Sequence, residues 1–91
     1  MNSSQLPPNI EELFGSLAQR ATSLTPTEHN ILRYYAEGKG VSEVAEQACI
    51  SINTVRRHNA NIYQKLGVSS REELLLYIEL FRRCDRLDQL M

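Results

Sequence analysis

Residues that start and stop helices alternate along this chain of 91 residues. Thr25, Pro26 and Glu28 combine a capping hydroxyl, a first-turn proline and a carboxylate three residues after the cap, which is typical of a helix start. That helix should end near Glu37, with Gly38 in the left-handed conformation that closes a helix. Because such signals recur and no segment alternates like a strand, the sequence predicts a helical protein.

Two later helices are predicted by the same signals. Ser51 can cap a helix over residues 52–66, which Gly67 ends. Ser70 and Glu73 form a second capping box, so we expect a final helix that starts there and runs toward residue 90.

Two further helices complete the expected set. Asn9 follows a polar tail, residues 1–8, and can cap a helix whose apolar residues recur at helical spacing up to residue 21. Gly40 opens a short helix that runs through Ala48, and a tight turn follows. The chain is therefore expected to be all-α, with five helices and no internal repeat.

The composition fits one small globular domain. Hydrophobic residues make up 42% and charged residues 23% of the chain, which argues against disorder, and the length excludes a two-domain enzyme with a cleft between the domains. No apolar run is long enough to span a membrane, and the N-terminus lacks the pattern of a signal peptide. Cys49 and Cys84 are too few for a disulfide framework or a metal knuckle, so we expect free thiols, a cytoplasmic location, no metal and no other cofactor.

The net charge of −1 hides a strong asymmetry in the distribution of charge. Residues 47–71 contain four of the 10 basic residues and none of the 11 acidic ones. Such a segment concentrates positive potential on one face of a protein, which favours a nucleic acid as the partner.

The expected helix over residues 52–66 has an apolar and a polar side. Val55, Ile62 and Leu66 share one side, with Ile52 close by, and predict the core stripe. The polar side is free of carboxylates and consists of Asn53, Arg57, Ala60, Asn61 and Gln64, with Arg56 along one edge. Arginine suits guanine and Asn or Gln suits adenine in the major groove of DNA. The flank formed by Thr54, His58 and Lys65 suits phosphate oxygens.

The short helix, the turn at residues 49–51 and the longer second helix form a helix-turn-helix, in which the second helix enters the major groove. Ala45 is small enough to let the two helices cross closely, opposite Val55. Many such motifs have glycine in the turn. Because Cys49 stands there in this chain, we expect its backbone to avoid the left-handed region.

Together these motifs resemble the DNA-binding domain of the LuxR (NarL/FixJ or GerE) type over residues 22–80. The segments that carry the resemblance are Leu24–Glu28, Ala36–Gly38, Glu43–Ala45, Ser51–His58 and Asn61–Arg71. The resemblance implies a four-helix LuxR-type helix-turn-helix bundle, here with an extra N-terminal helix, in a bacterial transcription regulator that binds double-stranded DNA as a homodimer. We therefore expect residues 1–22 to be a tail with a linker-like helix, and residues 23–91 to be the DNA-binding domain with a C-terminal dimerisation helix.

The resemblance also implies roles for single residues. Arg56 matches a position that touches bases, and Arg57 and Ala60 match positions that tune the sequence read. With the chemistry above, the expected base readers are Asn53, Arg56, Arg57, Ala60 and Gln64, and the expected contacts to the DNA backbone are Thr54, His58, Asn61 and Lys65. Two departures from the family should weaken affinity. The segment 40–42 lacks the family's Ser or Thr cap and its lysine, and Ala60 replaces a basic residue of some family members.

The last helix has two apolar sides. Leu74, Ile78 and Phe81 face the bundle, whereas a second seam has no partner within a small bundle and consists of Leu76, Leu80, Cys84, Leu87 and Met91. A second copy of the chain would give a homodimer interface through Leu76, Leu80, Cys84 and Leu87. The alternative is that the helix over residues 9–21 covers this seam in cis.

Other functions fit the sequence less well. His29 and His58 lack partners at nucleophile or metal spacing and no glycine-rich phosphate loop occurs, so we expect neither an enzyme nor a small-molecule ligand. A sigma-factor region-4-like domain would end soon after its recognition helix, whereas another long helix follows here. A helical protein-interaction adaptor stays open because the net charge is −1 and the basic cap residue is missing. RNA polymerase is a candidate second partner of a DNA-bound regulator.

Overall fold

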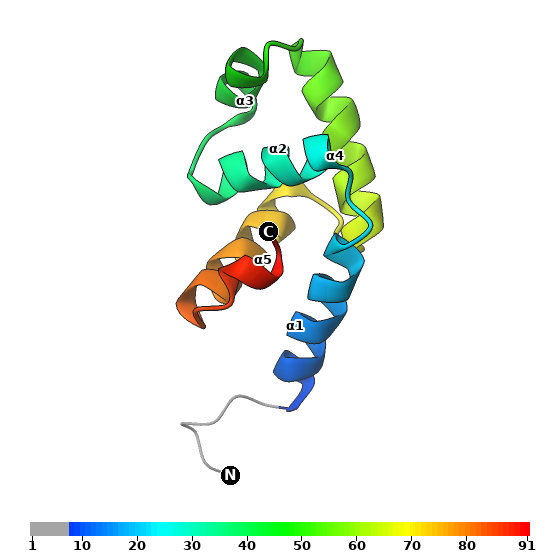
Figure 1. The fold of residues 1–91 in the computed structure, drawn as a ribbon, viewed down its shortest axis with the longest axis vertical. Coiled ribbons are helices and arrows are strands. Elements are labelled where there is room, and N and C mark those ends of the chain that lie inside the picture. Colours follow the sequence, from blue (N-terminus) through cyan, green and yellow to red (C-terminus); the bar gives the residue numbers. More distant parts are fainter. Residues whose placement is uncertain (1–7) are drawn as a thin grey trace.

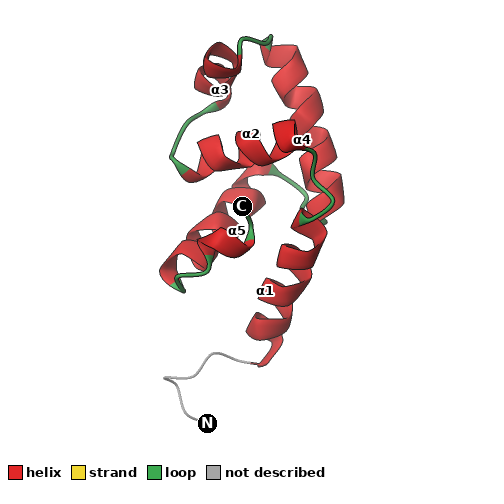
Figure 2. Ribbon diagram, viewed as in Figure 1, coloured by secondary structure: helices red, strands yellow, loops and turns green. Residues whose placement is uncertain are grey.

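The computed structural model describes residues 8–91, and this part of the chain is helical throughout (Figures 1 and 2). Its elements are α1 (Pro8–Ala21), α2 (Pro26–Ala36), α3 (Val41–Ala48), α4 (Ile52–Leu66), α5 (Arg71–Arg83) and the 3₁₀ helix η1 (Leu87–Gln89). The all-α prediction is confirmed. The expected tail lies outside the described residues up to position 7, and α1 begins at Pro8, so Asn9 lies inside the helix and does not cap it.

The starts of α2 and α4 follow the sequence signals. In α2 the Thr25 hydroxyl accepts the Glu28 N–H at 3.1 Å, and the Glu28 carboxylate accepts the Thr25 N–H at 2.9 Å, which completes the capping box. In α4 the Ser51 hydroxyl accepts the Thr54 N–H at 3.1 Å, and Gly67 ends the helix at φ +74°. These predictions are confirmed. They could be made from the sequence because the groups that form each cap are close together along the chain.

The turn between α3 and α4 contradicts the expectation for Cys49. Its backbone is left-handed, with φ +58° and ψ +42°. This conformation lets the Cys49 N–H bond the Glu46 carbonyl at 3.3 Å and the Ile50 N–H bond the Ala45 carbonyl at 3.0 Å, which satisfies the last carbonyls of α3. The left-handed backbone costs a non-glycine residue about 1–2 kcal/mol, and the closed turn offsets that cost.

The last helix is shorter than predicted. α5 ends at Arg83, and the chain reverses through Asp85 at φ +56°, where the Arg86 N–H bonds the Phe81 carbonyl at 2.8 Å. The reversal buries Leu90 in the core, which a straight helix could not do. At the start of α5 the expected capping box is half formed, because the Glu73 carboxylate accepts the N–H of Ser69 and not that of Ser70.

One core joins all five α-helices. The predicted stripe of α4 (Val55, Ile62, Leu66) and the inner side of α5 (Leu74, Ile78, Phe81) are buried, which confirms both. Ile52 is 40% exposed, so its assignment to the stripe is wrong. It lies in the first turn of α4, next to the turn at 49–51, at the end of the fold that α3 occupies (Figure 1).

α1 packs on the rest of the domain in cis, at the end away from α3 (Figure 1). The rings of Phe14 and Phe81 meet edge to face with centroids 4.6 Å apart. The Glu11 carboxylate pairs with Arg86 at 2.7 Å. No helix among residues 8–91 is both long and apolar enough to cross a bilayer.

Candidate nucleic-acid interface

The helix-turn-helix is built on buried contacts between α3 and α4. Val44 and Ala45 on α3 and Val55 on α4 are all buried in the core, as the crossing predicted from the sequence requires. The turn then presents the first half of α4 at one tip of the molecule (Figure 2). Because α3 and α4 share buried side chains, the outward side of α4 is held by a rigid support.

The outward side of α4 matches the side predicted from the sequence. All six residues expected there are exposed: Asn53, Arg56, Arg57, Ala60, Asn61 and Gln64. Within residues 8–91, neither Arg56 nor Arg57 forms an ion pair. Other basic residues do pair with carboxylates, namely Lys39, Lys65, Arg82, Arg83 and Arg86. Arg56 and Arg57 therefore place two positive charges, unpaired within the described residues, next to each other on the outward side of α4.

Two residues expected on the DNA backbone, Thr54 and His58, are half-buried beside this exposed side. The hydroxyls of Thr54 and Ser51 lie 2.9 Å apart, so Thr54 contributes to the cap of α4. The Nδ1 atom of His58 is buried without a hydrogen-bond partner within the described part of the chain. Both side chains lie next to the two arginines on the same helix.

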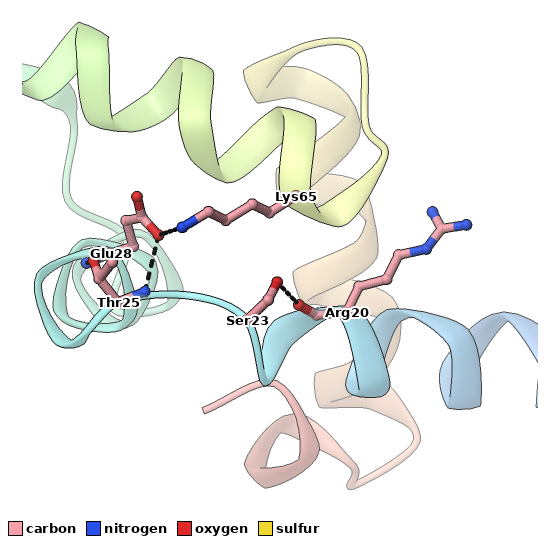
Figure 3. Close-up of polar contacts among 5 residues, drawn as sticks. All are labelled: Arg20, Ser23, Thr25, Glu28 and Lys65. Carbon is pink, nitrogen blue, oxygen red and sulfur yellow. Dashed lines mark hydrogen bonds and ion pairs between the residues drawn. The ribbon is translucent and has the colours of Figure 1, made fainter.

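Lys65, the remaining residue expected on the DNA backbone, is engaged inside the protein. Its Nζ lies 2.8 Å from the carboxylate of Glu28, which is 3% exposed (Figure 3). Burial raises the pKa of the Glu28 carboxyl, but the hydrogen bonds from Lys65 and Thr25 outweigh it and hold that pKa below the usual range. Lys65 also lies in the last turn of α4, far along the helix from the turn at residues 49–51.

The C-terminal end of α1 holds the C-terminal end of α4 in place. The Ser23 hydroxyl donates to the Arg20 carbonyl at 2.7 Å and closes the end of α1 (Figure 3). The Arg20 guanidinium donates to the Leu66 carbonyl at 3.2 Å, so α1 caps the C-terminus of the helix whose other end meets α3.

Sequence reasoning missed a buried polar residue on α4. Asn59 is 5% exposed and accepts a hydrogen bond of 2.7 Å from the hydroxyl of Tyr35, which is 2% exposed. Its spacing was the available signal, because Asn59 stands four residues after Val55 and three before Ile62, within the apolar stripe. Burial raises the pKa of the Tyr35 hydroxyl, so it keeps its proton and donates.

The seam expected at a dimer interface does not form one continuous line, because α5 ends at Arg83. Leu76 is 70% exposed and borders a shallow groove of about 370 Å³ on the outer side of α5, lined by Leu76, Tyr77, Glu79, Leu80 and Arg83. Cys84 and Leu87 lie beyond the helix and pack against the core, as does Met91. Leu80 also packs partly against the core, so Leu76 is the most exposed residue of this seam.

Comparison with known proteins points to one family. A family model described as "Bacterial regulatory proteins, luxR family" matches residues 22–78. The chain is 43% identical over 56 residues to the transcriptional activator protein BglJ of Escherichia coli K12, 44% over 54 residues to the fimbriae Z protein of Salmonella typhimurium, and 46% over 55 residues to the transcriptional regulatory protein LiaR of Bacillus subtilis.

These matches cover 62%, 59% and 60% of this chain but only 25%, 26% and 26% of the three relatives. The chain thus spans about a quarter of their length. No solved protein structure gives a significant match.

Proposed function

Because this chain belongs to the luxR family of bacterial regulatory proteins and carries the helix-turn-helix of its DNA-binding transcription regulators, we propose that it reads double-stranded DNA by inserting α4 into the major groove. The observation that carries the proposal is the exposed, carboxylate-free side of α4, on which Arg56 and Arg57 have no ion-pair partner within residues 8–91. DNA binding would make the bacterial cytoplasm its place of action.

We propose distinct roles for the residues of this surface. Arg56 and Arg57 can each fork onto guanine, Asn53 and Gln64 can pair with adenine, and Ala60 permits close approach to a thymine methyl group. Thr54, His58 and Asn61 border this set and suit phosphate oxygens. Lys65 is better assigned to holding α4 on α2, because its ammonium group is already paired with the buried Glu28.

The proposal can be tested by selecting bound sequences from random duplexes and measuring affinity for the selected site. We expect Arg56→Ala and Arg57→Ala each to weaken that site by about 1–3 kcal/mol, or roughly 5- to 150-fold, and to relax the base preference. Arg33→Ala is the matched control, because Arg33 is an exposed arginine on α2 whose side chain bonds Asn30 and no carboxylate within residues 8–91. Equal losses on selected and random DNA would contradict the base-reading roles.

Salt dependence separates this function from that of a protein-interaction adaptor. A dimer that makes about six phosphate contacts should show a slope near −5 in a plot of log affinity against log salt concentration. A protein-interaction adaptor would not bind DNA and so would show no such slope.

We further propose that the chain binds DNA as a homodimer through Leu76 and Leu80. The support is that Leu76 is 70% exposed beside a groove lined by Tyr77 and Leu80, where a second copy of α5 could cover it. Half-sites would then lie about 10 base pairs, or roughly 34 Å, apart. Leu76→Glu should shift the protein to monomer in sedimentation, whereas Gln19→Glu, an equal change of charge at an exposed position of α1, should not.

RNA polymerase is the second partner that we propose. The support is that one relative is named a transcriptional activator. A pull-down of polymerase with the DNA-bound dimer, compared with the DNA alone, tests this.

A further inference from the structure

On the premise that α4 reads bases, we infer that the buried hydrogen bond between Tyr35 and Asn59 sets the rotation of α4 about its own axis. Asn59 would then be a positioning residue for sequence discrimination, although it is buried and faces away from the exposed side of α4. Three features of the pair lead to this inference: its cost, its direction and its place on the helix.

The pair is polar in a place where apolar side chains would suffice. Tyr35 and Asn59 lie between α2 and α4 and, apart from Glu28, which pairs with the last turn of α4, the buried core of the described residues is built from aliphatic and aromatic side chains. A buried polar pair adds little net stability over an apolar pair of the same shape, and it becomes costly when only one partner is removed. Stability therefore gives little reason to place it here.

A hydrogen bond restricts rotation in a way that the apolar contacts of α4 do not. Val55, Ile62 and Leu66 bury area, and burial has no preferred direction. The Tyr35–Asn59 bond is 2.7 Å long, and bonds between such groups weaken when the oxygen atoms move beyond about 3.0 Å. A small turn of α4 would break this bond near the middle of the helix, whereas the other directional contact with α2, the Lys65–Glu28 ion pair, acts on the last turn through a long side chain.

The donor is held from its other side by α5. The Arg71 guanidinium, on the first residue of that helix, lies 5.3 Å from the centre of the Tyr35 ring. This cation–π contact fixes the ring whose hydroxyl bonds Asn59. The rotation of α4 is thus fixed relative to two other helices, to α2 directly through Tyr35 and to α5 through Arg71.

Asn59 is well placed for control of the base-reading residues. It follows Arg56 by three residues and directly precedes Ala60. Side-chain atoms lie about 5–6 Å from a helix axis, so a rotation of about 10° moves them by about 1 Å. Functional groups must be held to within about 0.5 Å, so such a rotation would misalign both arginines with their bases.

The test is the double variant Tyr35→Phe/Asn59→Leu, which removes both polar groups and keeps the packing. We expect its melting temperature and its affinity for random DNA to stay close to those of the unmodified protein. Its preference for the selected site over single-base variants should fall about tenfold. The matched control is Ile62→Leu, a volume-conserving change in the same stripe of α4, which should keep the preference.

The possible results separate the inference from the proposed function. Full sequence preference in a folded double variant would overturn the inference and leave the proposed function intact. An unmodified protein with no sequence preference would overturn both. If the double variant fails to fold, Tyr35→Phe alone removes only the donor hydroxyl, and a preference unchanged by that variant would equally overturn the inference.

Discussion

Replacing Lys65 with methionine tests whether this residue stabilises the fold or contacts DNA. Glu28 is 3% exposed, and Lys65 is its ion-pair partner at 2.8 Å. Removing one partner of a fully buried ion pair costs about 3–5 kcal/mol. The Lys65 side chain is 33% exposed, so water can reach the vacated place, and the Thr25 N–H still bonds the carboxylate. We therefore expect Lys65→Met to cost about 2 kcal/mol, which lowers the melting temperature of a domain this size by about 8–16 °C.

The matched variants are Glu28→Gln and the double variant Glu28→Gln/Lys65→Met. Glutamine can still accept the Thr25 N–H and so keeps the capping box. The double variant buries no unpaired charge, and it should be more stable than Lys65→Met alone. A coupling energy of about 1–2 kcal/mol in this cycle would identify the ion pair as the cause.

The same ion pair predicts how stability depends on pH. The pKa of the Glu28 carboxyl is lowered in the folded state, since the bonds from Lys65 and Thr25 outweigh burial. Its contribution to stability is therefore complete above the unfolded pKa, near 4.5, and is lost as pH falls through the folded value. Thermal unfolding between pH 7 and pH 3 should show a steeper acid loss for the unmodified protein than for Glu28→Gln.

DNA binding supplies the result that would refute this assignment. Measured where both proteins are folded, Lys65→Met should leave the salt slope of DNA affinity unchanged. A slope shallower by about 1 would identify Lys65 as a phosphate contact, as the sequence suggested. A melting temperature unchanged by the substitution would likewise contradict the role in stability.

Two further predictions concern α3 and its turn. Ser42→Lys, at an exposed position of the segment that lacks a basic residue, should strengthen binding to all duplexes and steepen the salt slope by about 1, whereas Ser16→Lys on α1 should do neither. Cys49→Gly should raise the free energy of unfolding by up to about 1 kcal/mol in urea titrations, because Cys49 has φ +58° and glycine adopts that conformation at little cost. A loss of stability would show that the Cys49 side chain contributes more than its backbone costs.

The helix starts and the outward side of α4 were predictable because they depend on neighbours in sequence. The bond between Thr25 and Glu28 spans three residues, and the side on which Arg56 and Arg57 lie follows from helical periodicity alone. The burial of Val55, Ile62 and Leu66 was predictable for the same reason.

The features that sequence reasoning missed depend on distant partners. Glu28 and Lys65 are 37 residues apart, and Tyr35 and Asn59 are 24 apart, so no local pattern pairs them. The end of α5 at Arg83 depends on contacts that the chain makes after it reverses. Leu90 then packs in the core, and Arg86 pairs with Glu11 of α1. The apolar periodicity of α5 continues past Arg83 in the sequence because Leu87 and Met91, which follow the turn, also pack against the core.

The distribution of carboxylates explains how a chain of net charge −1 can attract DNA. Arg82 and Arg83 find Glu79 three and four residues away on their own helix, so their charge is neutralised locally. α4 contains no carboxylate, so Arg56 and Arg57 have none at those spacings, and the acid-free segment extends beyond both ends of the helix. The carboxylate that does reach α4, Glu28, is buried and bonds its last turn. Introducing a carboxylate at the exposed Ala60, four residues after Arg56, would therefore offset one of the two arginine charges on this side of α4 and should weaken DNA binding without changing the fold.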